Sequence, residues 1–344
     1  MQVHVYLPSG KGCSLTVSPE WKVYEVKAEA QRQLKRCCLS LAFGGQQLDP
    51  SCTLSDSGLQ DGDSIAAIAQ PIKLASTRGA FALVVEGAVR TWGNPGKGGV
   101  SDRVEEKLVH VRHIQGSDKA FAAILESGSV VTWGQCVPLA QGQLLPRGQQ
   151  IQAASNAFAV IQDDGSASTF DDGSLELQPS NHVQAQLVRV QQIQASHRAF
   201  AAIRDDGSVV TWGNPDYGGD SSQVQKRLAG VHQIQATEGA FAAILDNGSV
   251  VTWGNPGYGG DSSRVQEQLV GVQRIQATFQ AFAAIRADGS VVTWGNPHSG
   301  ADSSHVREQL VQVHQIQATE RAFAAIRADG SVVTWGNPHS KGSW

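Results

Sequence analysis

The 344-residue chain lacks long apolar runs, and no segment approaches the roughly 20 apolar residues that a membrane-spanning helix needs. Its first residues, MQVHVYLPSGKG, lack the basic region and apolar block of a secretory signal. Neither sign of charge dominates, since 27 basic and 31 acidic residues give a net charge of −4. This balance excludes a strong attraction to nucleic acid or to an acidic membrane. We therefore expect an intracellular protein, cytoplasmic or nuclear, that binds neither.

Cysteine is scarce and forms no CxxC pair. The five cysteines are Cys13, Cys37, Cys38, Cys52 and Cys136. An odd number without metal-ligand spacing indicates reduced thiols rather than a disulfide framework. The ten histidines contain no HxH or HExxH motif, so we expect no metal site and no cofactor. No Ser/His/Asp or Cys/His arrangement stands out, and we expect no enzymatic activity.

The most prominent feature of the sequence is repetition. The fifteen residues AFAAIRADGSVVTWG occur at Ala281–Gly295 and again, unchanged, at Ala322–Gly336. Consecutive copies start 37 to 42 residues apart. Five further versions begin at Ala80, Ala120, Ala157, Ala199 and Ala240. Residues 1–70 do not share this period, so the sequence predicts one domain over residues 1–70 and a seven-repeat domain over residues 71–344.

Each repeat has three recognisable parts. The first is a strand such as Val272–Thr278. The second is a hairpin around Ala287-Asp288-Gly289, because Asp-Gly between β-prone runs is a strong hairpin signal. The third is a connector such as GNPGYGGDSSRVQEQLVG, in which Asp-Ser-Ser is predicted to cap a short helix. Val265 and Leu269 then lie on one face of that helix.

A single unit of this size cannot bury its own hairpin and needs a neighbour on each side. An open solenoid and a closed ring both satisfy that need. Near-identical copies without a polar capping unit favour the ring, and seven is a usual number of propeller blades. The sequence therefore favours a ring in which the first and last units meet, and it leaves the open solenoid as the alternative.

The motif L/I-x-x-D-G-S-V-V-T-W-G-N-P-x-Y-G-G resembles the repeat of the regulator-of-chromosome-condensation family. The matching landmarks are Ile244, Gly248, Val250, Trp253-Gly254 and Gly259-Gly260. The resemblance implies a mainly-β seven-bladed propeller with short helices in the connectors between blades. Members of the family include an exchange factor, parts of ubiquitin ligases and a light sensor, so the fold implies no single function.

The pattern of apolar and polar residues in 1–70 predicts elements in the order β-β-α-β-β, with an amphipathic helix at Val23–Leu34. This order resembles ubiquitin and implies an α+β ubiquitin-like, or β-grasp, domain. The landmarks shared with ubiquitin are Met1-Gln2, Gly10-Lys11, Pro19, Val26-Lys27-Ala28, Phe43, Gln47-Leu48 and Thr53-Leu54-Ser55-Asp56. Ubiquitin's diglycine tail is replaced by a chain that continues into the repeats, so conjugation through this end is not expected.

The resemblance places ubiquitin's apolar recognition patch on Pro8, Ala42 and Ile68. Of these, Ile68 alone keeps a sizeable aliphatic side chain. We therefore keep Ile68 as a candidate for partner binding.

One tryptophan recurs in nearly every repeat. The series is Trp92, Trp133, Trp212, Trp253, Trp294 and Trp335, with Phe170 in the remaining slot. A light-sensing chromophore and a packing role are the two interpretations. One aromatic residue per unit at strand spacing favours packing.

The copies differ mainly just before each hairpin and just after each Trp-Gly. Loops held on a rigid scaffold commonly bind partners, although neutral drift of solvent-facing residues is the alternative. The candidate partner-binding residues are Arg78, Lys119, Arg198, Glu238, Phe279 and Arg321 before the hairpins, and Tyr217 and Tyr258 in the connectors. The divergent segments Gln135–Gln150 and Phe170–Ser180 indicate either degeneration or a separate docking site.

These features predict a non-enzymatic adaptor that binds protein partners, and the ubiquitin-like domain suggests a link to ubiquitin pathways. A regulator of a small GTPase, of the guanine-nucleotide exchange type, is the alternative, and a tryptophan-based light sensor is a third. Exchange would require a wedge or an acidic loop that projects from one face, and no long insertion separates the repeats.

Overall fold

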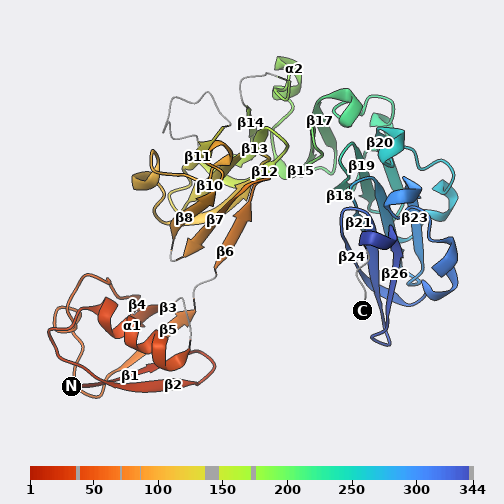
Figure 1. Ribbon diagram of the computed structural model, residues 1–344. Coiled ribbons are helices and arrows are strands. Elements are labelled where there is room, and N and C mark those ends of the chain that lie inside the picture. Colours follow the sequence, from red (N-terminus) through yellow and green to blue (C-terminus); the bar gives the residue numbers. More distant parts are fainter. Residues whose placement is uncertain (36–38, 70–71, 86, 136–146, 172–175, 341–344) are drawn as a thin grey trace.

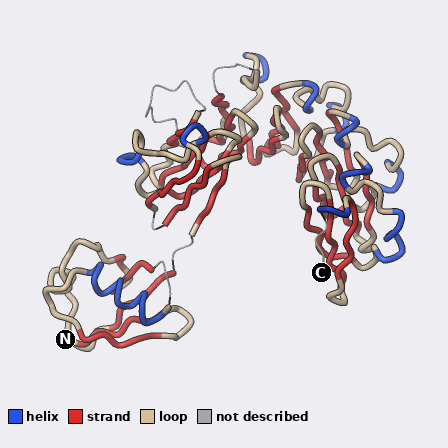
Figure 2. The backbone as a smooth tube through the Cα atoms, viewed as in Figure 1, coloured by secondary structure: helices blue, strands red, loops and turns tan. Residues whose placement is uncertain are grey.

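The computed structural model describes residues 1–35, 39–69, 72–85, 87–135, 147–171 and 176–340 (Figure 1). The first part is a five-stranded sheet with one helix, and seven separate three-stranded sheets follow it. Within these ranges, no helix combines the length and the apolar character needed to cross a membrane. Figure 2 shows how completely strands dominate the second part of the chain.

The strands of the first sheet lie in the order β2-β1-β5-β3-β4, with β1 antiparallel to β2 and parallel to β5. The helix buries Val23, Val26, Ala30 and Leu34 against the sheet. Its bounds agree with the sequence prediction. The elements are β1 (Gln2–Tyr6), β2 (Gly12–Thr16), α1 (Val23–Leu34), β3 (Leu39–Phe43), β4 (Gln46–Gln47) and β5 (Ser64–Ala69). The expected domain boundary at residues 70 and 71 lies outside the described ranges.

Each of the seven following sheets consists of three antiparallel strands. The first three are β6 (Lys73–Ser76), β7 (Ala80–Val85), β8 (Ala88–Gly93); β9 (Val111–Gly116), β10 (Ala120–Leu125), β11 (Val130–Gly134); and β12 (Gly148–Ala153), β13 (Ala157–Gln162), β14 (Ala167–Asp171). The last four are β15 (Val190–Ala195), β16 (Ala199–Arg204), β17 (Val209–Gly213); β18 (Val231–Ala236), β19 (Ala240–Leu245), β20 (Val250–Gly254); β21 (Val272–Ala277), β22 (Ala281–Arg286), β23 (Val291–Gly295); and β24 (Val313–Ala318), β25 (Ala322–Arg327), β26 (Val332–Gly336). The seven repeats in the sequence therefore correspond to seven sheets.

The hairpin turn contains a glycine in each unit, and an aspartate or asparagine precedes that glycine in the last five units. In the sixth unit Gly289 has φ +75°, which a residue with a side chain rarely adopts. The Asp288 carboxylate accepts hydrogen bonds from the backbone N–H and the hydroxyl of Ser290, at 2.9 and 2.6 Å. The predicted hairpin is confirmed, and its register places Phe282 opposite Trp294.

The two faces of every middle strand carry different residues. Along β22, Phe282 and Ala284 pack against the fifth sheet, while Ala281, Ala283 and Ile285 pack against the seventh. This alternation follows from the two-residue period of a strand. Small alanines on one face leave room for the large Phe–Trp pair of the next unit, so neighbouring sheets form a shared core.

The connectors contain shorter helices than the sequence predicts. The capped helix expected after Asp261 is a single 3-10 turn, η6, at Gln266–Gln268. The Ser262 hydroxyl forms hydrogen bonds with the side chains of Gln266 and Thr252, at 2.9 Å each. These bonds hold the residues before the turn in a non-helical position. Leu269 is fully buried and Val265 is partly buried in the same core, so the expected apolar face exists.

The same pattern of one-turn helices recurs along the array. The connector helices are η1 (Pro95–Lys97), η2 (Glu105–Lys107), α2 (Asn181–Gln184), η3 (Pro215–Tyr217), η4 (Gln225–Arg227), η5 (Pro256–Tyr258), η6 (Gln266–Gln268), η7 (Pro297–Ser299), η8 (Ser304–Gln309) and η9 (Pro338–Ser340). Of these, α2 alone is an α-helix, and it spans four residues.

Four of the repeat tryptophans pack beneath the connector of the preceding unit. The Trp294 indole N–H donates to the carbonyl oxygen of Gly259 at 3.1 Å. Gly259 has φ +93°, and a Cβ there would lie 2.7 Å from the Phe282 ring. The equivalent pairs are Trp133 with Gly98, Trp253 with Gly218, and Trp335 with Gly300. These tryptophans therefore have the packing role that the sequence favours.

The seven sheets follow one another along an open arc, with β6–β8 at one end and β24–β26 at the other (Figure 1). The two ends therefore do not meet, in contrast to the closed ring that the sequence favours. The sheets nevertheless stack face to face as propeller blades do. Phe81 and Trp92 of the first sheet remain 44% and 46% exposed. Beside them, Arg90 occupies the register position at which the sixth sheet carries the buried Val292. Arg90 thus gives the outer face of the first unit a polar residue, although the sequence indicated no polar capping unit.

The glycine beneath each aromatic pair provides a test of this architecture. We predict that Gly259→Ala lowers the free energy of unfolding by about 1–3 kcal/mol, because it combines an unfavourable φ with a clash against Phe282. Gly257→Ala in the same turn is the matched control, since its Cβ would meet only the Asn255 side chain, at 3.3 Å. Urea denaturation followed by circular dichroism measures both, and equal effects would contradict the packing model.

Candidate interaction surface

Seven residues, one just before each hairpin, form a continuous line across the sheets. Each of the first six donates its backbone N–H to the carbonyl oxygen of the equivalent residue in the next unit, at 2.8 to 3.2 Å. We call this line the rim belt. It consists of Arg78, Asp118, Ser155, His197, Glu238, Phe279 and Glu320. Residues about 41 positions apart in sequence thus become direct neighbours.

A serine or threonine stands directly before the belt residue in six of the seven units, the third unit having Ala154 instead, and its hydroxyl bonds the start of the hairpin. In the sixth unit the Thr278 hydroxyl accepts from the Ala281 N–H at 3.0 Å and donates to the Ser299 carbonyl at 2.9 Å. This links the start of the hairpin to the tip of the connector in the same unit. Ser196 and Thr237 make the same bond to the carbonyls of Tyr217 and Tyr258. The two regions in which the copies differ therefore lie on one surface.

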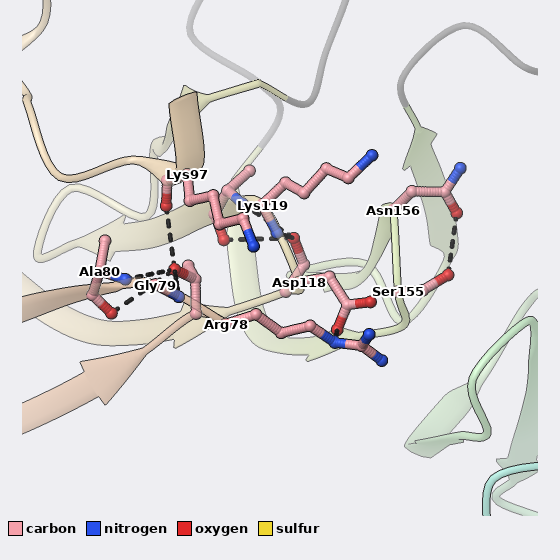
Figure 3. A network of polar contacts seen from close by, with 11 residues as sticks. Arg78, Gly79, Ala80, Lys97, Asp118, Lys119, Ser155 and Asn156 are labelled. Carbon is pink, nitrogen blue, oxygen red and sulfur yellow. Dashed lines mark hydrogen bonds and ion pairs between the residues drawn. The ribbon is translucent and has the colours of Figure 1, made fainter. Parts of the chain in front are cut away.

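The first three units contribute a polar cluster to the belt (Figure 3). The Arg78 guanidinium lies 2.9 Å from the Asp118 carboxylate. Arg78, Asp118, Ser155 and His197 line a shallow hollow of about 370 Å³. Lys119 follows Asp118 and is exposed. This part of the belt presents both signs of charge within a few residues.

The fourth unit carries the densest cluster of side chains. Arg198 pairs with Glu176 at 3.3 Å and lies over the Tyr217 ring, 5.6 Å from its centroid. The His197 and Tyr217 rings are 5.9 Å apart. Burial lowers the pKa of His197, and Arg78 and Arg198 act in the same direction, whereas Asp118 and Glu238 oppose them. His197 is therefore biased toward its neutral form.

In the fifth unit a tyrosine lies on a glycine. The Tyr258 ring would come within 3.2 Å of a Cβ at Gly239, so a larger residue there would displace it. Burial raises the pKa of Tyr258, and the neighbouring Glu238 carboxylate raises it further. Next along the belt, Phe279 is 40% exposed. An aromatic side chain beside charged neighbours is typical of a protein-binding surface.

The structure brings eight of the nine candidate residues to this surface. Arg321 is exposed and directly follows the belt residue Glu320. Ile68 lies apart, on β5 of the first domain, where it is 46% exposed and pairs with Ser40. The sequence marks the divergent segment Phe170–Ser180 as degenerate or as a docking site, but it does not identify Glu176 within it as the partner of Arg198. Residues 136–146 and 172–175 of the two divergent segments lie outside the described ranges.

Metal-ligand chemistry is not found at this surface. Among the residues that the structure describes, no group of three or more His, Cys, Asp or Glu side chains is placed to hold a metal ion. The side chains of the rim belt are instead suited to ion pairs, hydrogen bonds and aromatic contacts.

Comparison with known proteins agrees with the fold of the first part. Residues 2–71 match the model of the ubiquitin family. They form a ubiquitin-like domain. The chain continues from this domain into the first repeat. A comparison with curated proteins finds no match.

Several solved structures show a distant likeness to the chain. Prp20p from Saccharomyces cerevisiae, reported with its binding to Gsp1p and histones, is 13% identical, with 66% of this chain and 72% of that chain covered and a TM-score of 0.43. The ectodomain of the Arabidopsis thaliana receptor kinase ACR4 is 15% identical, with coverages of 79% and 97% and a TM-score of 0.45. The ectodomain of the Physcomitrella patens receptor kinase CR4 is 12% identical, with coverages of 78% and 73% and a TM-score of 0.47. Likeness at this level carries no conclusion about function.

The environment of His197 predicts a dependence of stability on pH. Because its pKa is lowered in the folded chain, the unfolded chain binds a proton there more readily. The free energy of unfolding should therefore fall as the pH drops through the ordinary histidine pKa of about 6.5. We expect His197→Gln to reduce that fall, since glutamine does not titrate.

Urea denaturation between about pH 7.5 and pH 5 measures this effect, and an imidazole titration followed by NMR assigns it to His197. Burial also lowers the pKa of His113. Because His113 is present in the unmodified protein and in the His197→Gln variant, its contribution cancels when their free energies of unfolding are subtracted. An identical pH dependence in the two chains would contradict the prediction.

Proposed function

We propose that the chain is a non-enzymatic adaptor that binds protein partners through the rim belt. The observation that carries this proposal is the hydrogen-bonded line from Arg78 to Glu320, which joins the positions at which otherwise similar repeats differ. The framework beneath the line repeats nearly unchanged. Variable side chains on a rigid framework form the kind of surface that recognises other proteins.

The composition of the belt supports protein rather than nucleic-acid recognition. Asp118, Glu238 and Glu320 place acidic side chains along the belt, so it carries no basic stripe that would track phosphates. The exposed Phe279 and the stacked Arg198–Tyr217 pair provide the aromatic and arginine side chains that often dominate binding energy.

The repeats are proposed to be of the regulator-of-chromosome-condensation type, arranged like propeller blades. The Trp-Gly strand end, the Asp-Gly turn and the Gly-rich connector support this assignment, and each has a defined packing role here. The ubiquitin-like domain is proposed to act as a second, non-conjugatable recognition module linked to ubiquitin pathways. No observation on the described surface favours the exchange-factor alternative, since the connectors there are short one-turn structures.

Affinity capture with the full-length chain tests the adaptor proposal. Phe279→Ala is expected to reduce the specific partners retained from a cell extract by about tenfold or more, which corresponds to the loss of one aromatic anchor. Val270→Ala is the matched control, because Val270 is 49% exposed but lies at the opposite rim, beside the hairpin turns. Quantitative mass spectrometry compares the three chains. Retention of the same partners at the same level by all three would overturn the proposal.

A further inference from the structure

The outer side of the first sheet is an exposed apolar surface of unusual composition. We call it the terminal face and define it by Leu74, Phe81, Leu83, Arg90 and Trp92. The rings of Phe81 and Trp92 stack with centroids 5.5 Å apart. Leu74 is 61% exposed, Phe81 44% and Trp92 46%. Isolated exposed apolar side chains are common, but a contiguous set of this kind marks an interaction site.

The interior of the array shows what covers such a pair. Phe282 and Trp294 occupy the same register as Phe81 and Trp92, and they are 0% and 4% exposed. Their cover is a turn from the preceding unit, in which the left-handed Gly259 lies against the phenyl ring and its carbonyl accepts the indole N–H. Three further junctions repeat this geometry. Four junctions in this chain thus show the same turn packed on a Phe–Trp pair.

The terminal face differs from the interior faces at one central position. Arg90 replaces a valine that is 1–6% exposed in five other sheets, namely Val131, Val210, Val251, Val292 and Val333. Burying an unpaired guanidinium beneath another apolar sheet would be costly. No ion pair joins Arg90 to a carboxylate in the described part of the chain. The face is therefore suited to an occupant that combines a compact turn with an acidic group.

The last connector of this chain does not fit as the occupant. Lys341 stands in the sequence where the other connectors have the left-handed glycine, as in Asn296-Pro-His-Ser-Gly300 against Asn337-Pro-His-Ser-Lys341. A Cβ at Gly300 would lie 2.7 Å from the ring of Phe323 in the next sheet. Any residue with a Cβ in the glycine position of such a junction would introduce this clash. Closure of the array on this connector, in the same chain or in a second copy, therefore lacks the glycine that four interior junctions use.

We propose that the terminal face binds a glycine-containing turn of a partner protein. A glycine in the left-handed conformation packs on Phe81, and its carbonyl oxygen accepts the Trp92 indole N–H. A carboxylate next to the turn pairs with Arg90. This surface is separate from the rim belt, so the failure of one proposal leaves the other standing.

The chain's own connector provides a probe of defined chemistry. The peptide GNPGYGGDSSRVQEQLVG, residues 254–271, contains the turn and an aspartate directly after its two glycines. The full-length protein is labelled with 5-fluorotryptophan, and Trp92→Phe assigns the Trp92 resonance in the ¹⁹F NMR spectrum. The peptide is expected to shift this resonance saturably while the buried tryptophans stay unchanged.

Matched changes in the peptide and the protein separate the parts of the proposal. A peptide with Gly259→Ala is expected to bind at least about tenfold more weakly, whereas Gly257→Ala keeps its affinity. A peptide with Asp261→Asn is expected to lose affinity for the original protein but not for Arg90→Gln, which tests the ion pair. Because Arg90 and Trp92 are exposed, both protein variants should fold, and circular dichroism verifies this.

Three results would overturn the proposal. One is a Trp92 resonance that the peptide does not shift, or that the Gly259→Ala peptide shifts equally. Another is a Trp92 side chain inaccessible to a soluble quencher in the unmodified protein, which would mean that the array closes on itself. The third is concentration-dependent self-association abolished by Trp92→Ala, measured by analytical ultracentrifugation, since the occupant would then be a second copy.

Discussion

The contact on which the array depends is the approach of a glycine backbone to a Phe–Trp pair. Because Gly259 has no side chain, its carbonyl reaches the Trp294 indole and its Cα lies against Phe282. This contact joins two consecutive units, and the alanine-rich face of the earlier sheet completes the core around it. The hairpin turns, the one-turn helices and the buried hydroxyls all hold the strands and connector in positions that permit this approach.

Features determined by local chemistry could be predicted from the sequence. The helix at Val23–Leu34 and the turn at Asp288-Gly289 depend on residues within a few positions of one another. The rim belt could be predicted only in outline, because the bond between Glu238 and Phe279 depends on how two whole units stack. The same reason explains why the polar role of Arg90 was missed: its position on the outer face is visible only when its register is compared with that of Val292.

Framework and recognition are separated within each unit. The residues that form the core between sheets repeat nearly unchanged, whereas the belt changes from Arg78 to Phe279 to Glu320 without altering the backbone path. In the fourth unit a diverged connector still contributes, since Glu176 pairs with Arg198, and Trp212 bonds the Thr169 hydroxyl instead of a glycine carbonyl. The architecture therefore tolerates loss of the standard connector where another polar group satisfies the indole.

The neighbour-to-neighbour bonding of the rim belt also bears on how such a molecule changes over generations. Every junction involves consecutive units, and the last three repeat starts are spaced by the same 41 residues. Duplication or loss of one 41-residue block inside the array would leave each remaining junction with a partner of the same kind. Duplication or deletion of one repeat in the gene can thus lengthen or shorten the rim belt by one unit, while every junction between units keeps its present packing.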